Sequence, residues 1–159
     1  MSEPTVIHST FTIEREYAAT RERVFAALSE PELKRRWFAD GEKSTVEEFT
    51  MDFRVGGTDV TSFRAGEESP IPNIVVTNRT TYLDIVPEER VVLAYTMNMG
   101  ERRFSASMAT FELRATGTGT GTLLVFTEQG AYFPYSDGPE IRKHGWTALL
   151  GQLAGVLGA

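Results

Sequence analysis

Apolar residues near the end of the chain recur with the period of an α-helix. Between Gly138 and Leu157 the large apolar side chains are Trp146, Leu149, Leu150, Leu153 and Leu157. Their spacing of three or four positions places them on one face of a helix. Pro139 suits a first helical turn, where its missing N–H group leaves no hydrogen bond unmade, and Asp137 or Gly138 can cap it. The pattern therefore predicts a long helix over 138–157 with one face to bury.

Most of the chain before this helix alternates between apolar and polar residues, as half-buried strands do. Residues 8–17 alternate in this way, and helical spacing follows over 20–29 and 32–38. Pro31 separates the two short helices, because proline is tolerated only in a first helical turn. Six more strands are predicted, over 46–54, 59–65, 73–86, 90–99, 103–115 and 122–129, with a tight hairpin turn at Gly56 and Gly57.

This order of elements predicts an α+β fold built on one curved, seven-stranded antiparallel sheet. The connections between successive strands are short, which favours an antiparallel meander. A twisted sheet of this size curls, and the final helix would fill its concave face. The two short helices after the first strand would form a V-shaped pair that cradles the final helix. A length of 159 residues suits a single domain over residues 1–159.

Composition and charge argue against several classes of function. The formal net charge of −6 is unfavourable for nucleic-acid binding, which needs a basic face. The chain contains no cysteine, and its two histidines are far apart in sequence, so no metal site and no cofactor are expected. No apolar run reaches the roughly 20 residues of a membrane span, and no signal peptide is recognisable. We therefore expect a cytoplasmic protein.

Several stretches of the sequence match a known family in the same order along the chain. They are Phe25 to Phe38, Asp52 to Gly57, Tyr82 to Leu93, Thr127 to Gly130, and Gly145-Trp146 with the leucines that follow. Together they resemble the START-like (SRPBCC) superfamily, which has the helix-grip fold of the birch pollen allergen. Within it they are most similar to the AHSA-type branch, bacterial proteins related to the C-terminal domain of the activator of the ninety-kilodalton heat-shock ATPase.

The resemblance implies a ligand cavity beneath the final helix, because superfamily members bind lipids, polyketides and other apolar molecules there. The side chains predicted to line it are Trp37, Phe53, Phe63, Tyr82, Tyr95, Met97, Met108, Phe126, Trp146 and Leu150. Each of them could instead belong to a packed core. Binding pockets are mostly apolar, and methionines suit a wall that adapts to its ligand.

Polar contacts to a ligand could come from Arg79, Glu128 and His144. Arg79, if it points inwards, could hold a carboxylate or phenolate, because a guanidinium keeps its charge when partly buried. Glu128 ends the last predicted strand, near the cavity mouth. His144 lies about 160° around the helix from Trp146, which favours an exposed position.

Two glutamates on the first strand offer a further alternative. Glu14 and Glu16 share one face of this strand, and a solvated outer face is the favoured interpretation. Inside an apolar cavity the same pair would have raised pKa values and could act as acid and base.

The predicted function is the binding of a small hydrophobic or amphipathic ligand, and no catalytic residue is assigned. One alternative is an enzyme of the polyketide-cyclase or hydrolase type that uses the same cavity. Another is a co-chaperone-like module that stimulates a heat-shock ATPase, although the eukaryotic co-chaperone has an additional N-terminal domain for its client. Exposed edge strands would also allow a homodimer.

Overall fold

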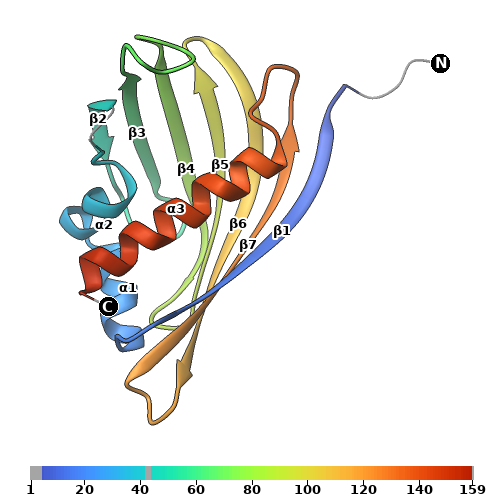
Figure 1. Cartoon of the computed structure of the whole chain (residues 1–159). Helices are drawn as coiled ribbons and strands as arrows, with labels where there is room; N and C mark the ends of the chain where they lie inside the picture. Colours follow the sequence, from blue (N-terminus) through green and yellow to red (C-terminus); the bar gives the residue numbers. More distant parts are fainter. Residues whose placement is uncertain (1–4, 42–43, 159) are drawn as a thin grey trace.

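The computed structural model describes residues 5–41 and 44–158 of the chain. Its elements are β1 (Ile7–Tyr17), α1 (Arg21–Ser29), α2 (Pro31–Phe38), β2 (Ser44–Thr50), β3 (Thr58–Ala65), β4 (Val75–Val86), β5 (Arg90–Met99), β6 (Arg102–Thr116), β7 (Gly121–Tyr132) and α3 (Pro139–Leu157). Figure 1 shows the sheet curving around α3, which crosses its concave face. The predicted helix-grip fold is confirmed.

The strands form one antiparallel sheet in the order β1-β7-β6-β5-β4-β3-β2. The first strand therefore pairs with the last, and β1 and β2 form the two edges. Strand alternation places every second side chain on the concave inner face. On β5 these side chains include Val91, Leu93, Tyr95 and Met97, and their cross-strand partners on β6 include Phe111, Ala109, Ser107 and Ser105.

The short helices start and stop where the sequence predicts. The Thr20 side chain caps α1 by accepting a hydrogen bond from the Arg23 backbone N–H at 3.2 Å, and Pro31 lies in the first turn of α2. The indole N–H of Trp37 donates to the Ala27 carbonyl at 2.8 Å, which ties α2 to α1. Arg23 of α1 donates to the Leu157 carbonyl, so the two short helices are also joined to the end of α3.

The core lies between the three helices and the inner faces of β1, β4, β5, β6 and β7. Trp146 of α3 packs on Phe126 at 4.3 Å and on Phe111 at 5.9 Å between ring centroids. The Tyr17 hydroxyl donates to the Leu150 carbonyl at 2.8 Å, which joins the far end of β1 to the helix. These aromatic contacts fix the position of α3 over one half of the sheet.

Two boundaries differ from the predicted ones by three residues or more. The connection between β2 and β3 is a loop over 51–57 rather than a tight hairpin turn, although Gly56 has the expected positive φ of 83°. Gly57 is required there because a Cβ atom would lie 2.2 Å from the Asp52 carbonyl oxygen. Strand β7 extends to Tyr132, three residues beyond its predicted end.

Candidate functional site

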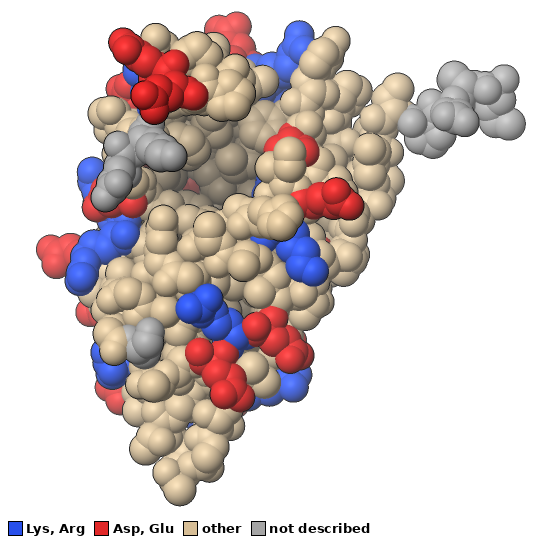
Figure 2. Space-filling view, viewed as in Figure 1, with Lys and Arg blue, Asp and Glu red and all other residues tan. Residues whose placement is uncertain are grey.

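A cavity opens between α3 and the inner face of β3, β4 and β5. Its volume is about 350 Å³, and Figure 2 shows a hollow on this face of the molecule. The lining residues are Phe38, Thr61, Phe63, Asn78, Tyr95, Met97, Asp137, Ile141, Arg142, Gly145, Trp146 and Leu149. Most of this lining is apolar, and the volume falls within the range of small-molecule pockets.

A second hollow of about 460 Å³ adjoins the first. It lies toward the loop after β3 and the loop before α3, where Pro70, Ile71 and Tyr135 contribute to its wall. The two hollows share Met97, Asp137, Ile141 and Arg142. The charged pair Asp137–Arg142 therefore stands where the two spaces meet.

Arg142 is buried near the start of α3, with its guanidinium surrounded by oxygen atoms. Its Nε and Nη2 atoms donate to the two carboxylate oxygens of Asp137, each at 2.8 Å. It also donates to the Ser105 hydroxyl at 2.8 Å and to the Tyr95 hydroxyl at 3.0 Å. Such a bidentate pair holds a carboxylate strongly and in one orientation.

Glu128 is fully buried on β7 and accepts hydrogen bonds from several strands and from α3. Its donors are the hydroxyls of Tyr95, of Tyr132 at 2.7 Å and of Ser107 at 3.3 Å, and the indole N–H of Trp146 at 3.0 Å. The Arg142 guanidinium lies 3.6 Å from the same carboxylate. A buried carboxylate needs hydrogen-bond donors and an opposite charge, and this network supplies both to Glu128.

Gly130 makes part of that network possible. A Cβ atom at this position would lie 2.7 Å from the ring and hydroxyl of Tyr132. The absence of a side chain therefore lets Tyr132 fold back along β7 and reach the carboxylate of Glu128, four residues away. This is a physical reason for the sequence Glu128-Gln-Gly130.

A second buried ion pair lies behind the cavity wall. Lys34 of α2 is 3.8 Å from the carboxylate of Asp59 on β3, which also accepts a hydrogen bond from the Tyr82 hydroxyl. The Lys34 ammonium lies 4.9 Å from the ring centroid of Phe38, a residue that lines the cavity. Burial lowers the pKa of Lys34, and the charge of Asp59 offsets part of this shift.

The ten predicted lining residues divide into three groups. Phe63, Tyr95, Met97 and Trp146 border the cavity. Trp37, Phe53, Tyr82, Phe126 and Leu150 pack in or against the core without bordering it. Met108 lies on the outer face of β6 and is 36% exposed, because its neighbour Ser107 points inwards to Glu128.

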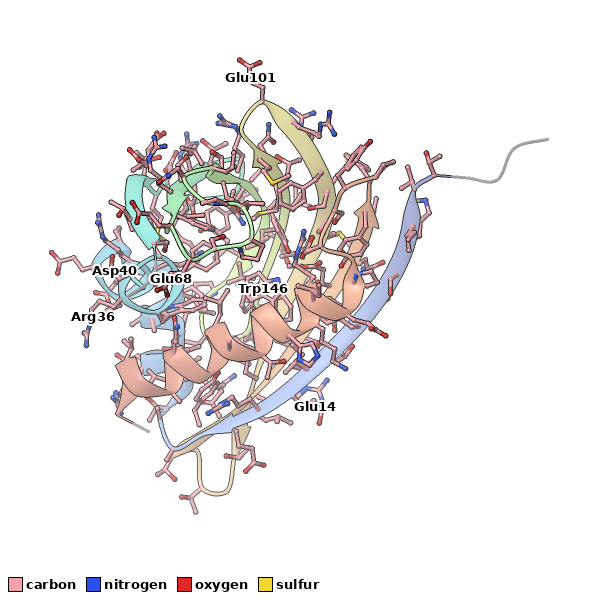
Figure 3. The ribbon with its side chains drawn as sticks, turned by 45° about the horizontal axis from the view of Figure 1, so that its top comes forward. Glu14, Arg36, Asp40, Glu68, Glu101 and Trp146 are labelled. Atoms are coloured by element: carbon pink, nitrogen blue, oxygen red, sulfur yellow. The ribbon has the colours of Figure 1, made fainter. Side chains whose placement is uncertain are left out.

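Strand alternation and helical spacing decide where the predicted polar contacts lie. Arg79 is exposed on the outer face of β4, because it lies three positions from the inward-facing Tyr82. His144 is exposed on α3, as its angle to Trp146 indicates. Glu14 and Glu16 are exposed on β1, and Figure 3 shows Glu14 pointing away from the interior. Glu128 faces inwards, but Tyr95 and Arg142 stand between it and the cavity.

Sequence reasoning missed Arg142 and Asp137, the charged groups that do border the cavity. A signal for Arg142 was present, because it lies four residues before Trp146 and so on the same helical face. A charged residue on an apolar helical stripe indicates a buried partner. Asp137 precedes the helix, and nothing in its spacing distinguishes a cap from a cavity residue.

The described part of the chain also limits other kinds of site. Within residues 5–41 and 44–158, no group of three or more histidine, aspartate or glutamate side chains is placed to hold a metal ion. None of the helices in this part combines the length and apolar character that a membrane crossing requires.

Comparison with known proteins places the chain in a family. The family model described as "Activator of Hsp90 ATPase homolog 1-like protein" matches residues 18–158. The chain belongs to this family. A comparison with curated proteins found no significant match.

Several solved structures share the fold of this chain over nearly its whole length. The Mll3558 protein from Rhizobium loti is 43% identical, with a TM-score of 0.84, and the match covers 97% of this chain and 100% of that one. A protein from Rhizobium leguminosarum is 37% identical, with a TM-score of 0.86 and coverage of 96% and 95%. DynU16, from the dynemicin biosynthetic locus, is 17% identical with a TM-score of 0.65, covers 94% of this chain and 47% of its own, and supports the fold alone.

Four buried tyrosines predict unfolding at alkaline pH. Burial raises the pKa of Tyr17, Tyr82, Tyr95 and Tyr132 above the ordinary 10.0, and nearby carboxylates add to the shift at the last three. The folded protein thus keeps protons that the unfolded chain loses, so stability is complete below about pH 10 and falls as the pH rises further.

The expected slope is about 1.4 kcal/mol per pH unit for each such tyrosine. Lys34, whose pKa is lowered from 10.5, acts in the opposite sense only below that value, where the unfolded chain binds the additional proton. Circular dichroism and tyrosinate absorbance should change together in an alkaline titration. Tyr135→Phe is the control, because Tyr135 is 76% exposed and its removal should leave the transition in place. Tyrosinate absorbance that develops fully while the fold persists would contradict the prediction.

Proposed function

We propose that this protein binds a small apolar or amphipathic molecule in the cavity between α3 and strands β3 to β5. The observation that carries the proposal is an open space of about 350 Å³ with a mainly apolar wall and a few polar groups at fixed positions. Asn78 and Thr61 on the sheet side are themselves buried, so they present fixed polar atoms at the wall. A few fixed polar groups in an apolar pocket orient a ligand, whereas a packed core leaves no such space.

Native mass spectrometry on protein purified from its own host tests the proposal. We expect a reproducible extra mass that is released into a solvent extract. Leu149 borders the cavity and is half-buried, so Leu149→Trp should fill the space and remove the extra mass. The matched control is Ala148→Trp, at the neighbouring exposed position on α3. The same spectra report whether the protein forms a homodimer.

Equal ligand content in both variants would argue against binding at this place. If the control also loses the extra mass, a tryptophan at each of the two positions disturbs the helix. Thermal unfolding of both variants distinguishes this case, because a correctly folded Leu149→Trp protein should unfold as cooperatively as the control.

An enzyme of the polyketide-cyclase or hydrolase type is the second candidate. The observation in its favour is that Tyr95, Asp137 and Arg142 converge on one part of the cavity wall. Conversion of the extracted ligand by the purified protein, and its loss in Asp137→Asn, would support this reading.

The family description also names an ATPase activator. If the turnover of a heat-shock ATPase does not change when the protein is added, the result would count against such a role.

A further inference from the structure

The pair between Arg142 and Asp137 differs from the other contacts of the guanidinium. Ser105, Tyr95 and Glu128 belong to β6, β5 and β7 and are held by the sheet. Asp137 belongs to the connection between β7 and α3. Its side chain is 25% exposed, whereas those of Arg142 and Glu128 are 8% and 0% exposed. Asp137 is therefore the most exposed of the three charged side chains in this cluster.

The segment 133–138 that carries Asp137 is held by few backbone hydrogen bonds. Phe133 donates to the Phe104 carbonyl, Ser136 donates back to the Phe133 carbonyl at 3.1 Å, and the Gly138 carbonyl accepts from the Arg142 N–H at 3.0 Å. Within the segment, the Ser136 hydroxyl donates to Asp137 Oδ1 at 2.8 Å and accepts from the Gly138 N–H at 3.2 Å. Tyr135 has a positive φ of 74°, which is unfavourable for a residue with a side chain. Segments with few backbone hydrogen bonds open at low cost in free energy. Asp137 can thus leave Arg142 at a smaller cost than a residue of the sheet.

The charges of the cluster restrict what can take the place of Asp137. One guanidinium faces the two carboxylates of Glu128 and Asp137, which gives a formal charge of −1. A ligand anion added to this cluster would change its formal charge from −1 to −2, and an unpaired negative charge in a partly buried place is costly. If the ligand's carboxylate replaces that of Asp137, the charge and both hydrogen bonds on Nε and Nη2 are conserved.

We propose that Asp137 holds the position of a ligand carboxylate, and that the cavity takes an apolar monocarboxylic acid. The ligand's carboxylate would accept the hydrogen bonds from Nε and Nη2 of Arg142, and Asp137 would turn toward solvent. The apolar body would extend along Met97, Trp146 and Leu149. This inference rests on the proposed ligand-binding function and names the class of ligand.

The apolar and polar parts of the wall are arranged as this proposal requires. Arg142 and Asp137 border both hollows, so a carboxylate at the guanidinium lies where the two spaces join. Ile141, next to Arg142 on α3, is 63% exposed at this place, which gives the ligand's body an apolar path to the opening. No covalent step is involved.

Matched probes of equal chain length separate this inference from the proposed function. Isothermal titration calorimetry with decanoate and with decan-1-ol compares a carboxylate with a neutral head on the same apolar body. Asp137→Asn keeps the shape of the side chain and removes its charge, so its competition for Arg142 weakens. We expect the affinity for decanoate to rise about tenfold, because a hydrogen bond between Arg142 and a neutral amide is weaker than one to a carboxylate by roughly this factor. The affinity for decan-1-ol should stay within about twofold.

Asp84→Asn is the control, because Asp84 forms an exposed ion pair with Arg90 at 2.7 Å on the outer end of the sheet. It should change neither affinity. If both probes bind and Asp137→Asn changes them equally or not at all, the inference is overturned while ligand binding stands. A weaker affinity for decanoate in Asp137→Asn also overturns it. If neither probe binds the wild-type protein, the result counts against both the inference and the proposed function.

Discussion

Glu128→Ala is expected to lower the free energy of unfolding by about 3–5 kcal/mol. The carboxylate is completely buried and accepts hydrogen bonds from Tyr95, Tyr132, Ser107 and Trp146. Its removal leaves the hydroxyls of Tyr95, Tyr132 and Ser107 without this acceptor, whereas the Trp146 indole N–H can still donate to the Tyr95 hydroxyl at 3.1 Å. The buried Arg142 is left with one carboxylate fewer. Each unsatisfied buried donor costs about 1–3 kcal/mol, and the positive charge adds to this. Replacement should therefore be much more harmful than the loss of one side chain's packing.

Urea unfolding followed by circular dichroism measures this effect. The control is Glu112→Ala on β6, whose ion pair with Arg114 at 3.6 Å joins two exposed side chains. Exposed pairs contribute little, so we expect a change within about 0.5 kcal/mol there. A loss below about 1 kcal/mol in Glu128→Ala would contradict the prediction and would mean that water reaches the vacated place. Glu128→Gln keeps one acceptor oxygen, so its loss of unfolding free energy should lie between those of Glu128→Ala and Glu112→Ala.

The order of elements could be predicted because local patterns and the global fold agree. Thr20, Pro31 and Pro139 mark helix starts by their own chemistry, and each lies where the structure begins a helix. Alternation along the strands requires a sheet with one buried face. The stripe on α3 then has one place to be buried, the concave face of that sheet. These are short-range features, and one sequence is enough to read them.

The site could be predicted only in part, because it depends on which face of each strand turns inwards. Tyr82 is predicted to line the cavity, and Arg79 offers a polar contact only if it points inwards. The two residues are three positions apart on one strand, so only one of them can face the ligand. The size of a side chain also does not distinguish cavity wall from core. Trp37 and Phe126 are completely buried, whereas Phe63 borders the space. That difference is decided by what packs opposite each residue.

The cavity exists where the sheet presents short side chains to α3. Phe111 and Phe126, from β6 and β7, fill the space beneath the helix and touch Trp146. On β3 and β4 the inward positions opposite one another are Thr61 and Asn78. These side chains are too short to reach the helix, so the sheet and α3 separate there without closing the gap. The cavity is therefore a consequence of the strand register, which places Thr61 and Asn78 opposite one another.

Trp146→Ala is expected to lower the free energy of unfolding by about 3–5 kcal/mol. The indole lies on the sheet side of α3 (Figure 3), packs on Phe126 and Phe111, and is 5% exposed. Its N–H group also donates to Glu128 at 3.0 Å. The alanine variant would therefore lose the packing of a large ring and one hydrogen bond to a buried charge.

Two further variants separate the contributions of this side chain. Trp146→Phe keeps most of the ring packing and loses the N–H donor, so it should cost about 1.5–3 kcal/mol, as for a hydrogen bond to a charged group. Leu149→Ala removes a half-buried side chain that borders the cavity, and its cost should be smaller than that of Trp146→Ala. Denaturant unfolding and ligand content are measured on all three. If Trp146→Ala costs less than about 2 kcal/mol but loses its ligand, Trp146 serves the cavity more than the core, because its packing then adds little to the fold.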